Sequence, residues 1–409
     1  MEEWKEYNIG NLCSRVCSGG TPSSRHTEYY DGNIPWLNTK EINFNRIYST
    51  ERCITEEGLN NSSAKWIDEN SVIVAMYGAT AGKTAIAKIP LTTNQACCNL
   101  TINSSIADYN FVYYHLCYKF TELALLANGG AQQNLNAQII KEFPILLPSL
   151  NEQRKIVSIL KSLDDKIEVN RRINDNLEQQ AQALFKSWFV DFEPFKNGEF
   201  VDSELGMIPK GWRVGTLGDI CVTNRRAYKG NFAHEIEYID TGSVTNNVID
   251  PPQILNPAKD KIPSRARRAV TEGDIIYSSV RPNQRHYALL FNPSFNTVVS
   301  TGFVVITANW SGYRYYIYQY LIQDEIVDKL QAIAEQSVST FPSLNATDIT
   351  NLKIVIPPNE VVGDFAIICC YFIEQIEKNQ QESRRLATLR DTLLPKLMSG
   401  ELKVNEVEI

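Results

Sequence analysis

The sequence predicts an α/β (α+β) fold of two similar mixed domains joined by two long antiparallel helices that form a coiled coil. The first observation is a repeat, because WKEYNIGNLC at 4–13 matches WRVGTLGDIC at 212–221. The match continues in LNAQIIKEFPILLP at 135–148 and LNATDITNLKIVIP at 344–357, after which the copies keep a constant offset. The second observation is a heptad pattern at the end of each copy. The two copies are therefore expected to form a pseudo-two-fold internal repeat.

Domain boundaries follow from changes of pattern within each copy. Short strand-like runs and turns come first, and EFPILLP or NLKIVIPP closes them before a long helical pattern begins. Turn formers and aromatic residues separate the copies, and Pro395 before SGEL is expected to break the second helix. The predicted segments are a first domain at 1–150, a long helix at 151–190, a linker at 191–211, a second domain at 212–358, a second long helix at 359–399 and a tail at 400–409.

Both long helices carry apolar residues alternately four and three positions apart, which is the seam of a coiled coil. An asparagine stands at the same seam position of each helix, where it fixes register, so the helices are expected to pack on each other. The alternative is that each amphipathic helix lies on its own domain. The expected seam residues are Ile156, Leu160, Leu163, Ile167, Asn170, Leu177 and Leu184, and Phe365, Phe372, Ile376, Asn379, Leu386 and Leu393.

A glycine-rich turn, YGATAGKT at 77–84, follows the strand-like run SVIVAM. Its Gly-Lys-Thr ending is typical of a phosphate-binding loop, but three residues separate Gly78 from Gly82 where that loop requires four. The second copy reads VRPNQRHYA here, so the glycines are not what the copies share. Both copies have a strand that leads into polar and basic side chains, which can hydrogen-bond base edges and phosphates.

These two turns supply the first candidate DNA contacts, with ordinary surface hairpins as the alternative. The candidates are Tyr77, Thr80, Lys83 and Thr84 in the first copy and Arg281, Asn283, Gln284, Arg285 and His286 in the second.

Composition limits the class of protein. With 43% hydrophobic and 10% aromatic residues, the 409 residues can build packed cores for two or three domains. No window approaches the roughly 18 apolar residues of a membrane span, and the start has no signal-peptide pattern, so a cytoplasmic protein without a membrane partner is expected. The nine cysteines contain no Cys-x-x-Cys pair and the four histidines are scattered, so neither disulfides nor a metal site is expected.

Charge is distributed unevenly around the net value of −7. Between residues 209 and 299, twelve Lys or Arg stand against eight Asp or Glu, whereas residues 1–150 have eleven against fourteen. Arg225, Arg226 and Lys229 form one basic cluster and join the candidate DNA contacts; 265–268 holds another. A basic cluster is more often a solvated face than a DNA site, so this asymmetry alone decides little.

Longer phrases recur along the chain in a fixed order: SGGTPSS with IPWLNTKEI, AMYGATAGKTAI, AQQNLNAQIIKEFPILLPSLNEQRKIVSILKSLDDKI, FKSWFVDFEPF, GMIPKGW and TLLPKLMSGEL. Together they resemble the specificity (S) subunit of type I restriction-modification systems, over essentially the whole chain. The second copy departs from the pattern, because Val361 and Val362 replace Glu152 and Gln153 and the glycine turn is absent. The resemblance adds four candidate DNA contacts, Thr21, Ser23, Arg25 and Gln133.

The resemblance implies two target-recognition domains, each reading one half of a bipartite, asymmetric site in double-stranded DNA, and helices that set the gap between the halves. The implied partners are methyltransferase (M) subunits that use S-adenosylmethionine and restriction (R) subunits that use ATP and Mg²⁺, with no cofactor in this chain. The sequence has no Asn-Pro-Pro-Tyr methyltransfer motif, in keeping with a non-catalytic subunit. A stand-alone bipartite DNA-binding protein and a nucleotide-hydrolysing enzyme remain as alternatives.

Overall fold

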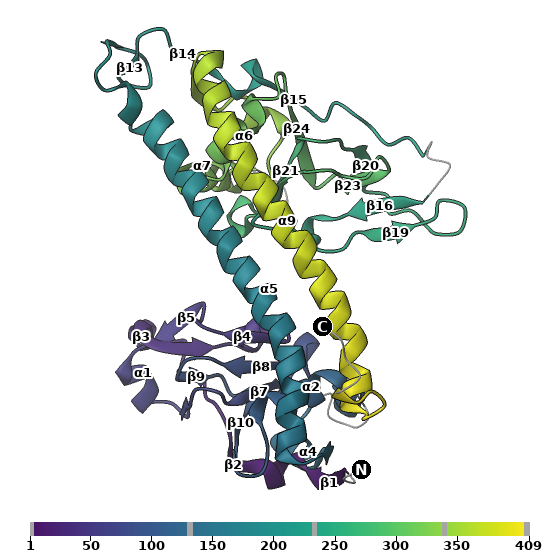
Figure 1. Ribbon diagram of the computed structural model, residues 1–409. Helices are drawn as coiled ribbons and strands as arrows, with labels where there is room; N and C mark the ends of the chain where they lie inside the picture. Colours follow the sequence, from purple (N-terminus) through teal and green to yellow (C-terminus); the bar gives the residue numbers. More distant parts are fainter. Residues whose placement is uncertain (1–3, 129–133, 231–234, 338–341, 405–409) are drawn as a thin grey trace. The chain divides into compact units, whose positions relative to one another are not determined.

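The computed structural model describes residues 4–128, 134–230, 235–337 and 342–404. The chain divides into two compact units: unit 1 comprises residues 1–169 with 382–409, and unit 2 comprises residues 170–381. Each unit contains sheets, short helices and a part of both long helices (Figure 1).

Unit 1 is built on a five-stranded sheet of order β2-β10-β7-β8-β4. Its middle strand β7 has the sequence VIVA and is buried at all four residues, as expected for an apolar strand covered on both faces. A second sheet of order β5-β3-β9-β6 packs on the first through a cluster that includes Leu37, Ile73 and Leu91. The strands are β2 (Cys13–Ser18), β3 (Tyr30–Leu37), β4 (Asn45–Ile47), β5 (Arg52–Ile54), β6 (Trp66–Ile67), β7 (Val72–Ala75), β8 (Thr84–Ala87), β9 (Leu91–Thr93) and β10 (Cys97–Ile102).

Helices cover the other face of the first sheet in unit 1. Asp108 caps α2 by accepting a hydrogen bond from the Asn110 N–H (2.8 Å), and Phe111 and Leu116 of this helix are completely buried. The pair β1 (Lys5–Asn8) and β11 (Pro144–Leu147) closes the domain, with Lys5 opposite Leu147. The helices are α1 (Glu56–Asn60), α2 (Tyr109–Tyr118), α3 (Phe120–Asn128) and α4 (Ala137–Glu142).

Unit 2 repeats this arrangement and so confirms the prediction of two similar α/β domains. Its sheets have the orders β15-β24-β21-β22 and β19-β16-β23-β20, and β14 pairs with β25 as β1 pairs with β11. The strands are β14 (Arg213–Thr216), β15 (Cys221–Thr223), β16 (Ile236–Ile239), β19 (Gln253–Leu255), β20 (Ala266–Ala269), β21 (Ile275–Ser278), β22 (Tyr287–Leu289), β23 (Thr297–Ser300), β24 (Phe303–Ala308) and β25 (Lys353–Ile356); the helices are α6 (Tyr313–Leu321), α7 (Asp324–Glu335) and α8 (Ala346–Thr350).

Two hairpins have no counterpart among the described residues of unit 1. The hairpin β17 (Val244–Thr245) and β18 (Val248–Ile249) lies along β22, where unit 1 places β4 along β8. The second hairpin, β12 (Phe200–Val201) and β13 (Ile208–Pro209), lies within the linker between the two copies. The two units therefore have equivalent sheets, and they differ in the segments that lie beside the edge strands.

The long helices are α5 (Leu150–Phe185), continued by a π-helical turn (Lys186–Val190), and α9 (Asn359–Met398). In unit 2 they pack antiparallel: the Asn170 Nδ2 donates to the Asn379 carbonyl (3.3 Å), and the Asn379 Nδ2 donates to Asn174 Oδ1 (2.8 Å). In unit 1, Arg390 Nη1 lies 2.8 Å from Asp164 Oδ1. The asparagines therefore bond across the seam, as predicted.

The seam residues divide by burial. Some are buried and the others are partly buried. Because Ile156 and Leu160 pack with the core of unit 1, and Phe365 and Ile376 with that of unit 2, the helices also lie on the domains. The partly buried ones are Ile167, Leu177, Leu184, Phe372, Asn379, Leu386 and Leu393.

The expectation that Pro395 would break the second helix is wrong, because α9 continues through it to Met398. A proline this close to a helix end removes only one of the last hydrogen bonds. Leu397 and Met398 are 0% and 2% exposed, and their burial holds the final turn in place. The helix ends instead at Met398, and Gly400 follows it with a left-handed φ of 74°.

Two simpler properties are also visible. All nine cysteines are free thiols, and Cys97, Cys98 and Cys369 are buried. No helix in the described residues has both the length and the apolar character needed to span a membrane.

Candidate nucleic-acid interface

The polar turns of unit 1 lie together at one end of the strands of its five-stranded sheet. Strand β7 ends and β8 begins at this edge, where β2 also ends and β10 begins. The Met76 N–H donates to the Ala96 carbonyl (2.8 Å), and the Leu135 N–H donates to the Met76 carbonyl (3.0 Å). The glycine-rich turn therefore lies beside the loop that precedes β10 and the segment that precedes α4.

Lys83 is anchored at this edge. Its Nζ donates to Asn43 Oδ1 (2.7 Å) and lies 6.0 Å from the centre of the Phe44 ring. Tyr77, at the start of the same turn, is 40% exposed, so it presents both a ring and a hydroxyl to solvent. Among the candidates of this turn, Lys83 and Tyr77 keep side chains that a ligand can reach.

The SGGTPSS segment reaches the same edge. An ideal Cβ on Gly19 would stand 2.0 Å from the Thr93 carbonyl oxygen, so this close approach requires glycine. The Thr21 hydroxyl then contacts Gln95 Oε1, in the loop before β10. Ser23 and Arg25 are exposed farther along this segment.

Thr84 must be removed from the candidate contacts. Its side chain is 0% exposed, and its hydroxyl donates to the Gly82 carbonyl (3.4 Å). Because successive side chains of a strand point to opposite faces, the residue that follows Lys83 turns into the core. Thr80 is half-buried and its hydroxyl donates to the Tyr77 carbonyl (3.3 Å), while Gln133 lies outside the described residues.

The turn between β21 and β22 in unit 2 follows the same backbone path without glycine. The Ser278 N–H donates to the His286 carbonyl (2.8 Å), as the Ala75 N–H donates to the Lys83 carbonyl (2.9 Å). The left-handed φ values of 71° and 85° at Gly78 and Gly82 recur as 49° and 56° at Arg281 and Arg285. Although the second copy lacks the glycines, it therefore keeps the turn.

Side chains of this second turn differ in their exposure to solvent. Arg281, Asn283 and Gln284 are exposed. Arg285 Nη2 lies 2.6 Å from Asp324 Oδ1 at the start of α7, and this hydrogen bond raises the pKa of the Arg285 guanidinium. The ion pair fixes Arg285 against α7.

His286 makes its contacts within unit 2. Its Nδ1 lies 2.5 Å from the Val244 carbonyl oxygen and 3.2 Å from the Thr245 hydroxyl. Because this nitrogen bonds the β17–β18 hairpin, His286 orients the hairpin against the turn.

The two basic clusters of unit 2 lie together. Ala227 forms a β-bridge with Arg268, which joins the segment of Arg225 and Lys229 to strand β20. Both Arg225 and Lys229 are exposed, and so is Arg265. The chain after β23 connects this cluster to the turn, because Thr301 donates to the Arg265 carbonyl (2.8 Å) and Gly302 accepts from Ser279 (2.8 Å).

Arg226, a predicted DNA contact, has a structural partner within unit 2. Its Nη2 lies 2.9 Å from Asp274 Oδ2, and the Asp274 side chain is 1% exposed. The guanidinium also contacts the Thr271 hydroxyl. Since a buried carboxylate requires a partner charge, we assign Arg226 to the fold of unit 2.

The sequence analysis did not identify several residues that lie beside these turns. Each is positioned by a contact that spans tens of residues, which a local pattern does not reveal. The repeat offers one signal, since Gln95 and Thr301 occupy corresponding loops before β10 and β24. The missed residues are Asn43, Gln95, Thr245, Thr301 and Asp324.

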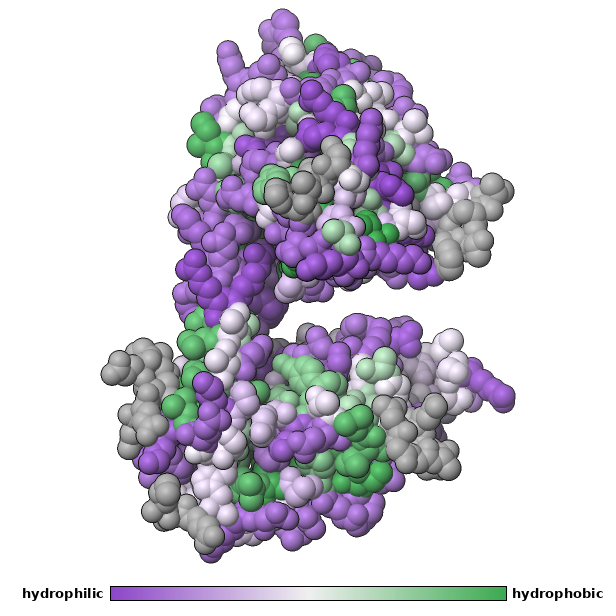
Figure 2. All heavy atoms as spheres, turned by 90° about the vertical axis from the view of Figure 1, so that its right-hand side faces the viewer, coloured by the Kyte–Doolittle hydropathy of each residue, from purple (hydrophilic) through white to green (hydrophobic). Residues whose placement is uncertain are grey.

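The surfaces of the units differ in hydropathy. Figure 2 shows a mainly hydrophilic surface on unit 2 and a group of hydrophobic residues on the surface of unit 1. Leu125 and Leu126 of α3 are among the exposed apolar side chains of unit 1, at 63% and 48%. In the part of the chain that the structure describes, no group of three or more His, Cys, Asp or Glu side chains is arranged to hold a metal ion.

Similarity to known proteins places this geometry in a family. The family described as "Type I restriction modification DNA specificity domain" matches residues 1–179 and 209–386. The type I restriction enzyme MjaIX specificity subunit of Methanocaldococcus jannaschii is 32% identical, across 99% of this chain and 98% of its own. The HindI specificity subunit of Haemophilus influenzae is 22% identical, across 98% of this chain and 100% of its own.

Among solved structures, the S subunit of the type I restriction-modification system of M. genitalium is 18% identical, with a TM-score of 0.49 and coverage of 97% of this chain and 96% of its own. The family matches both copies of the repeat, and the relative of M. jannaschii aligns with nearly the whole chain at 32% identity. The chain belongs to the family of type I restriction-modification DNA specificity subunits.

Proposed function

We propose that this chain is the DNA sequence-specificity subunit of a type I restriction-modification complex, and that units 1 and 2 each read one half of a bipartite, asymmetric site. One observation carries the proposal. Each unit holds a turn of the same backbone conformation at the same edge of an equivalent sheet, but with different side chains. Equal geometry with unequal hydrogen-bonding groups suits two half-sites of different sequence.

The side chains of the two turns have different chemistry for reading bases. In unit 2, Arg281 can donate two hydrogen bonds to a guanine, and Asn283 or Gln284 can pair with an adenine. In unit 1, Lys83 provides a point charge suited to a phosphate, and Tyr77 provides a hydroxyl and a ring. Unit 2 therefore has the stronger set of base-reading groups.

Backbone strain supports a functional role for the arginines. A left-handed conformation costs a residue with a Cβ roughly 1–2 kcal/mol, which glycine avoids. Unit 1 has glycine at both left-handed positions, whereas unit 2 has Arg281 and Arg285. Residues held in such conformations are concentrated at functional sites. We infer that these side chains are kept for recognition, because stability alone favours glycine there.

We further propose that the long helices set the gap between the half-sites and dock the M subunits, with R subunits completing the complex. Family membership supports this assignment. In this assignment, S-adenosylmethionine, ATP and Mg²⁺ are bound by the partner subunits, and this chain contributes DNA binding alone. The complex acts on DNA in the cytoplasm.

Exchange of one recognition domain tests the proposal. Residues 1–150 are replaced by the corresponding domain of a related subunit, the chimera is expressed with its M subunits, and the methylated motif is read by methylome sequencing. One half of the motif should change and the other should stay. The reverse exchange, of residues 212–358, should change the other half. A motif that changes in both halves, or in neither, contradicts two independent readers.

A second measurement separates this proposal from a stand-alone DNA-binding protein. The purified chain alone should bind a duplex containing its motif weakly, because it lacks the phosphate contacts that the M subunits supply in the complex. Tight, salt-resistant binding by the chain alone would favour the stand-alone hypothesis.

A further inference from the structure

In unit 1, a short segment that enters β4 links the glycine-rich turn to the helix α5. At the turn, Lys83 Nζ donates to Asn43 Oδ1 (2.7 Å). Three residues after Asn43, in β4 itself, Arg46 Nη1 lies 2.5 Å from Asp165 Oδ1 of α5. The Arg46 side chain is 13% exposed, so a largely buried charge holds β4 to the helix. The segment 43–46 therefore contacts both the turn and the helix.

In unit 2, the hairpin of β17 and β18 makes the same kind of link with different chemistry. Its two central residues, Asn246 and Asn247, have left-handed φ values of 47° and 63°, as the commonest two-residue hairpin turn requires. Their N–H groups donate to the carbonyls of Arg285 (3.0 Å) and Tyr287 (2.9 Å). On the helix side, Gln380 Nε2 of α9 donates to the Asn247 carbonyl (3.3 Å).

Side chains of the hairpin add to its contact with the turn. The Leu289 N–H donates to Asn247 Oδ1 (3.0 Å), and the Tyr287 hydroxyl donates to Asn246 Oδ1 (3.3 Å). Together with the bond from His286 to Val244, these contacts hold the residues where the turn enters β22. The hairpin is therefore bound to the end of the turn at several points and to α9 at Gln380.

The two links join equivalent parts of the two copies. In each unit the linking segment lies beside β8 or β22, the strand that leaves the turn, and it contacts the long helix that follows the domain in the same copy. The residues differ, because the repeat places Glu374 at the position of Asp165 and Arg171 at that of Gln380. Since different residues make the same connection, the connection is what the units share.

We infer that Arg46 and Gln380 are positioning residues for DNA recognition, each of which fixes the turn of its unit to the long helix of the same copy. The inference rests on the proposed function, because it takes the two turns as the groups that read the half-sites. Groups that recognise a ligand must be held to within roughly 0.5 Å of their working geometry. Loss of either link should therefore relax recognition of one half-site and leave the other unchanged.

Gln380→Glu tests the link in unit 2. The carboxylate keeps the size of the side chain but cannot donate to the Asn247 carbonyl. Gln381→Glu is the matched control, because it adds the same charge at the next position, where the amide bonds Glu377 of the same helix (3.0 Å). Methylation by the complex with M subunits is measured on duplexes that carry single mismatches. Gln380→Glu should lower discrimination in the unit 2 half-site about tenfold, the order of one base contact, and the control should change neither half.

Arg46→Gln tests the link in unit 1, and the same loss should fall on the other half-site. Asp165 keeps Lys161 as a partner in this variant, so the chain should fold. Lys161→Gln is the matched control, because it removes a bond to Asp165 from within α5 and leaves β4 attached. Arg46→Lys restores a positive charge beside Asp165 and should recover most of the lost discrimination.

Hydrogen exchange of the same complexes gives a readout that does not involve DNA. Amides of 281–289 should exchange about fivefold faster in Gln380→Glu, and those of 77–84 in Arg46→Gln, as expected for the loss of one hydrogen bond. Unchanged exchange at both turns, unchanged discrimination in both variants, or relaxation of both half-sites by one variant would overturn the inference. The domain exchange separates it from the proposed function: if exchange of residues 212–358 alters one half of the motif while Gln380→Glu alters neither, the link alone is wrong.

Discussion

The turn of unit 1 is built from glycine, and the turn of unit 2 is built from arginine and proline, yet both follow one backbone path. The hydrogen bonds that close the two turns join strands β7 and β8 in one unit and β21 and β22 in the other. Pairing of the strands thus fixes the path, even where Arg281 and Arg285 adopt it at a cost. The residues of the turn are free to vary for recognition while the sheet holds their positions.

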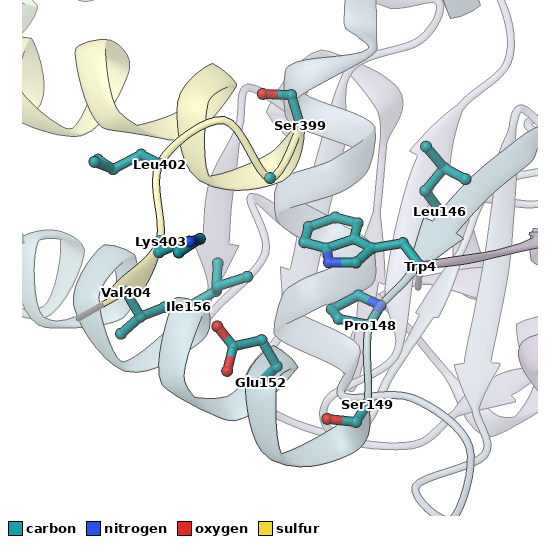
Figure 3. A pocket seen from close by; sticks show the side chains of 11 residues that line it. Trp4, Leu146, Pro148, Ser149, Glu152, Ile156, Ser399, Leu402, Lys403 and Val404 are labelled. Carbon is teal, nitrogen blue, oxygen red and sulfur yellow. The ribbon is translucent and has the colours of Figure 1, made fainter. Parts of the chain in front are cut away.

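The ends of the long helices give a second contrast. Unit 2 closes its helix end with Phe192 and Phe195 over Trp212, while unit 1 has an open cavity of about 400 Å³ at the equivalent place, beside Trp4 (Figure 3). The backbone is again similar at the two helix ends, because the second residue after each helix is left-handed, with φ of 53° at Phe192 and 74° at Gly400. The side chains determine whether the tryptophan there is buried in the core or borders the surface. The following predictions test both contrasts.

The largest difference is expected between the two tryptophans. Trp212→Ala should lower the unfolding free energy by about 3–5 kcal/mol, because three phenylalanine rings pack on the indole. Trp4→Ala should cost about 1–2 kcal/mol, since one face of this indole already borders a cavity. Urea unfolding of both variants measures the difference. Equal losses would mean that the aromatic cluster adds nothing to unit 2.

Arg281→Gly should have two opposite effects. DNA binding by the complex with M subunits should weaken by about 1–3 kcal/mol, because a base contact is lost. The unfolding free energy should rise by about 1 kcal/mol, because glycine relieves the left-handed strain. Gly78→Arg in unit 1 is the matched control and should lower stability. If Arg281→Gly destabilised the chain, the side chain would be holding the turn.

The two units are expected to respond oppositely to acid. In unit 2, burial raises the pKa of Glu178, although the Tyr318 hydroxyl donates to it (2.7 Å). In unit 1, partial burial would raise the pKa of Asp165, but hydrogen bonds from Lys161 and Arg46 outweigh it and lower that pKa. The protonated Glu178 therefore stabilises unit 2 below the unfolded-state pKa, and this is lost as pH rises through the folded-state pKa. Asp165 stabilises unit 1 above its unfolded-state pKa, and this is lost as pH falls through the folded-state pKa.

Matched amide variants test these signs. Glu178→Gln should gain up to about 1 kcal/mol at neutral pH and flatten the loss of stability from acidic to neutral pH. Asp165→Asn should lose less than about 1 kcal/mol at neutral pH, because the aspartate is partly exposed, and nothing at low pH. Urea unfolding midpoints of both variants, measured at acidic and at neutral pH, test these signs. Parallel pH profiles for the two variants would contradict the assignment.

The smallest effect is expected for Lys83→Ala. Loss of one phosphate contact should reduce the slope of log affinity against log salt concentration by about 1 and weaken binding of all sequences alike. Nucleotide affinity should be absent before and after the change, because the turn is one residue shorter than a phosphate-binding loop. Calorimetry with ATP checks the second point, and specific binding of ATP by the chain would restore the nucleotide hypothesis.

The sequence predicted the fold because its signals are periodic and occur twice. Heptads and repeated strand patterns depend on spacing, which remains visible without coordinates. The errors concern single residues whose burial or pairing depends on residues far away in the sequence. Burial of Leu397 carries the helix through Pro395, and Asp274, which lies 48 positions from Arg226, turns that arginine inward.

The candidate sites were predicted less completely for the same reason. The sequence indicated which turns are polar, but strand alternation decides that Thr84 faces the core and Lys83 does not. The cavity beside Trp4 depends on how the chain packs after α9, which no local sequence pattern indicates.

The burial of Leu397 and Met398 in unit 1 also concerns the order in which the protein can fold during synthesis. These residues pack with Ile9 and Leu12, so the core of unit 1 joins the two ends of the chain. Unit 2 is one uninterrupted stretch, 170–381, and is synthesised before Leu397 and Met398. Unit 1 is translated first and completed last. Its apolar surface stays partly uncovered while the rest of the chain is made, which is the period in which a growing chain is most exposed to aggregation.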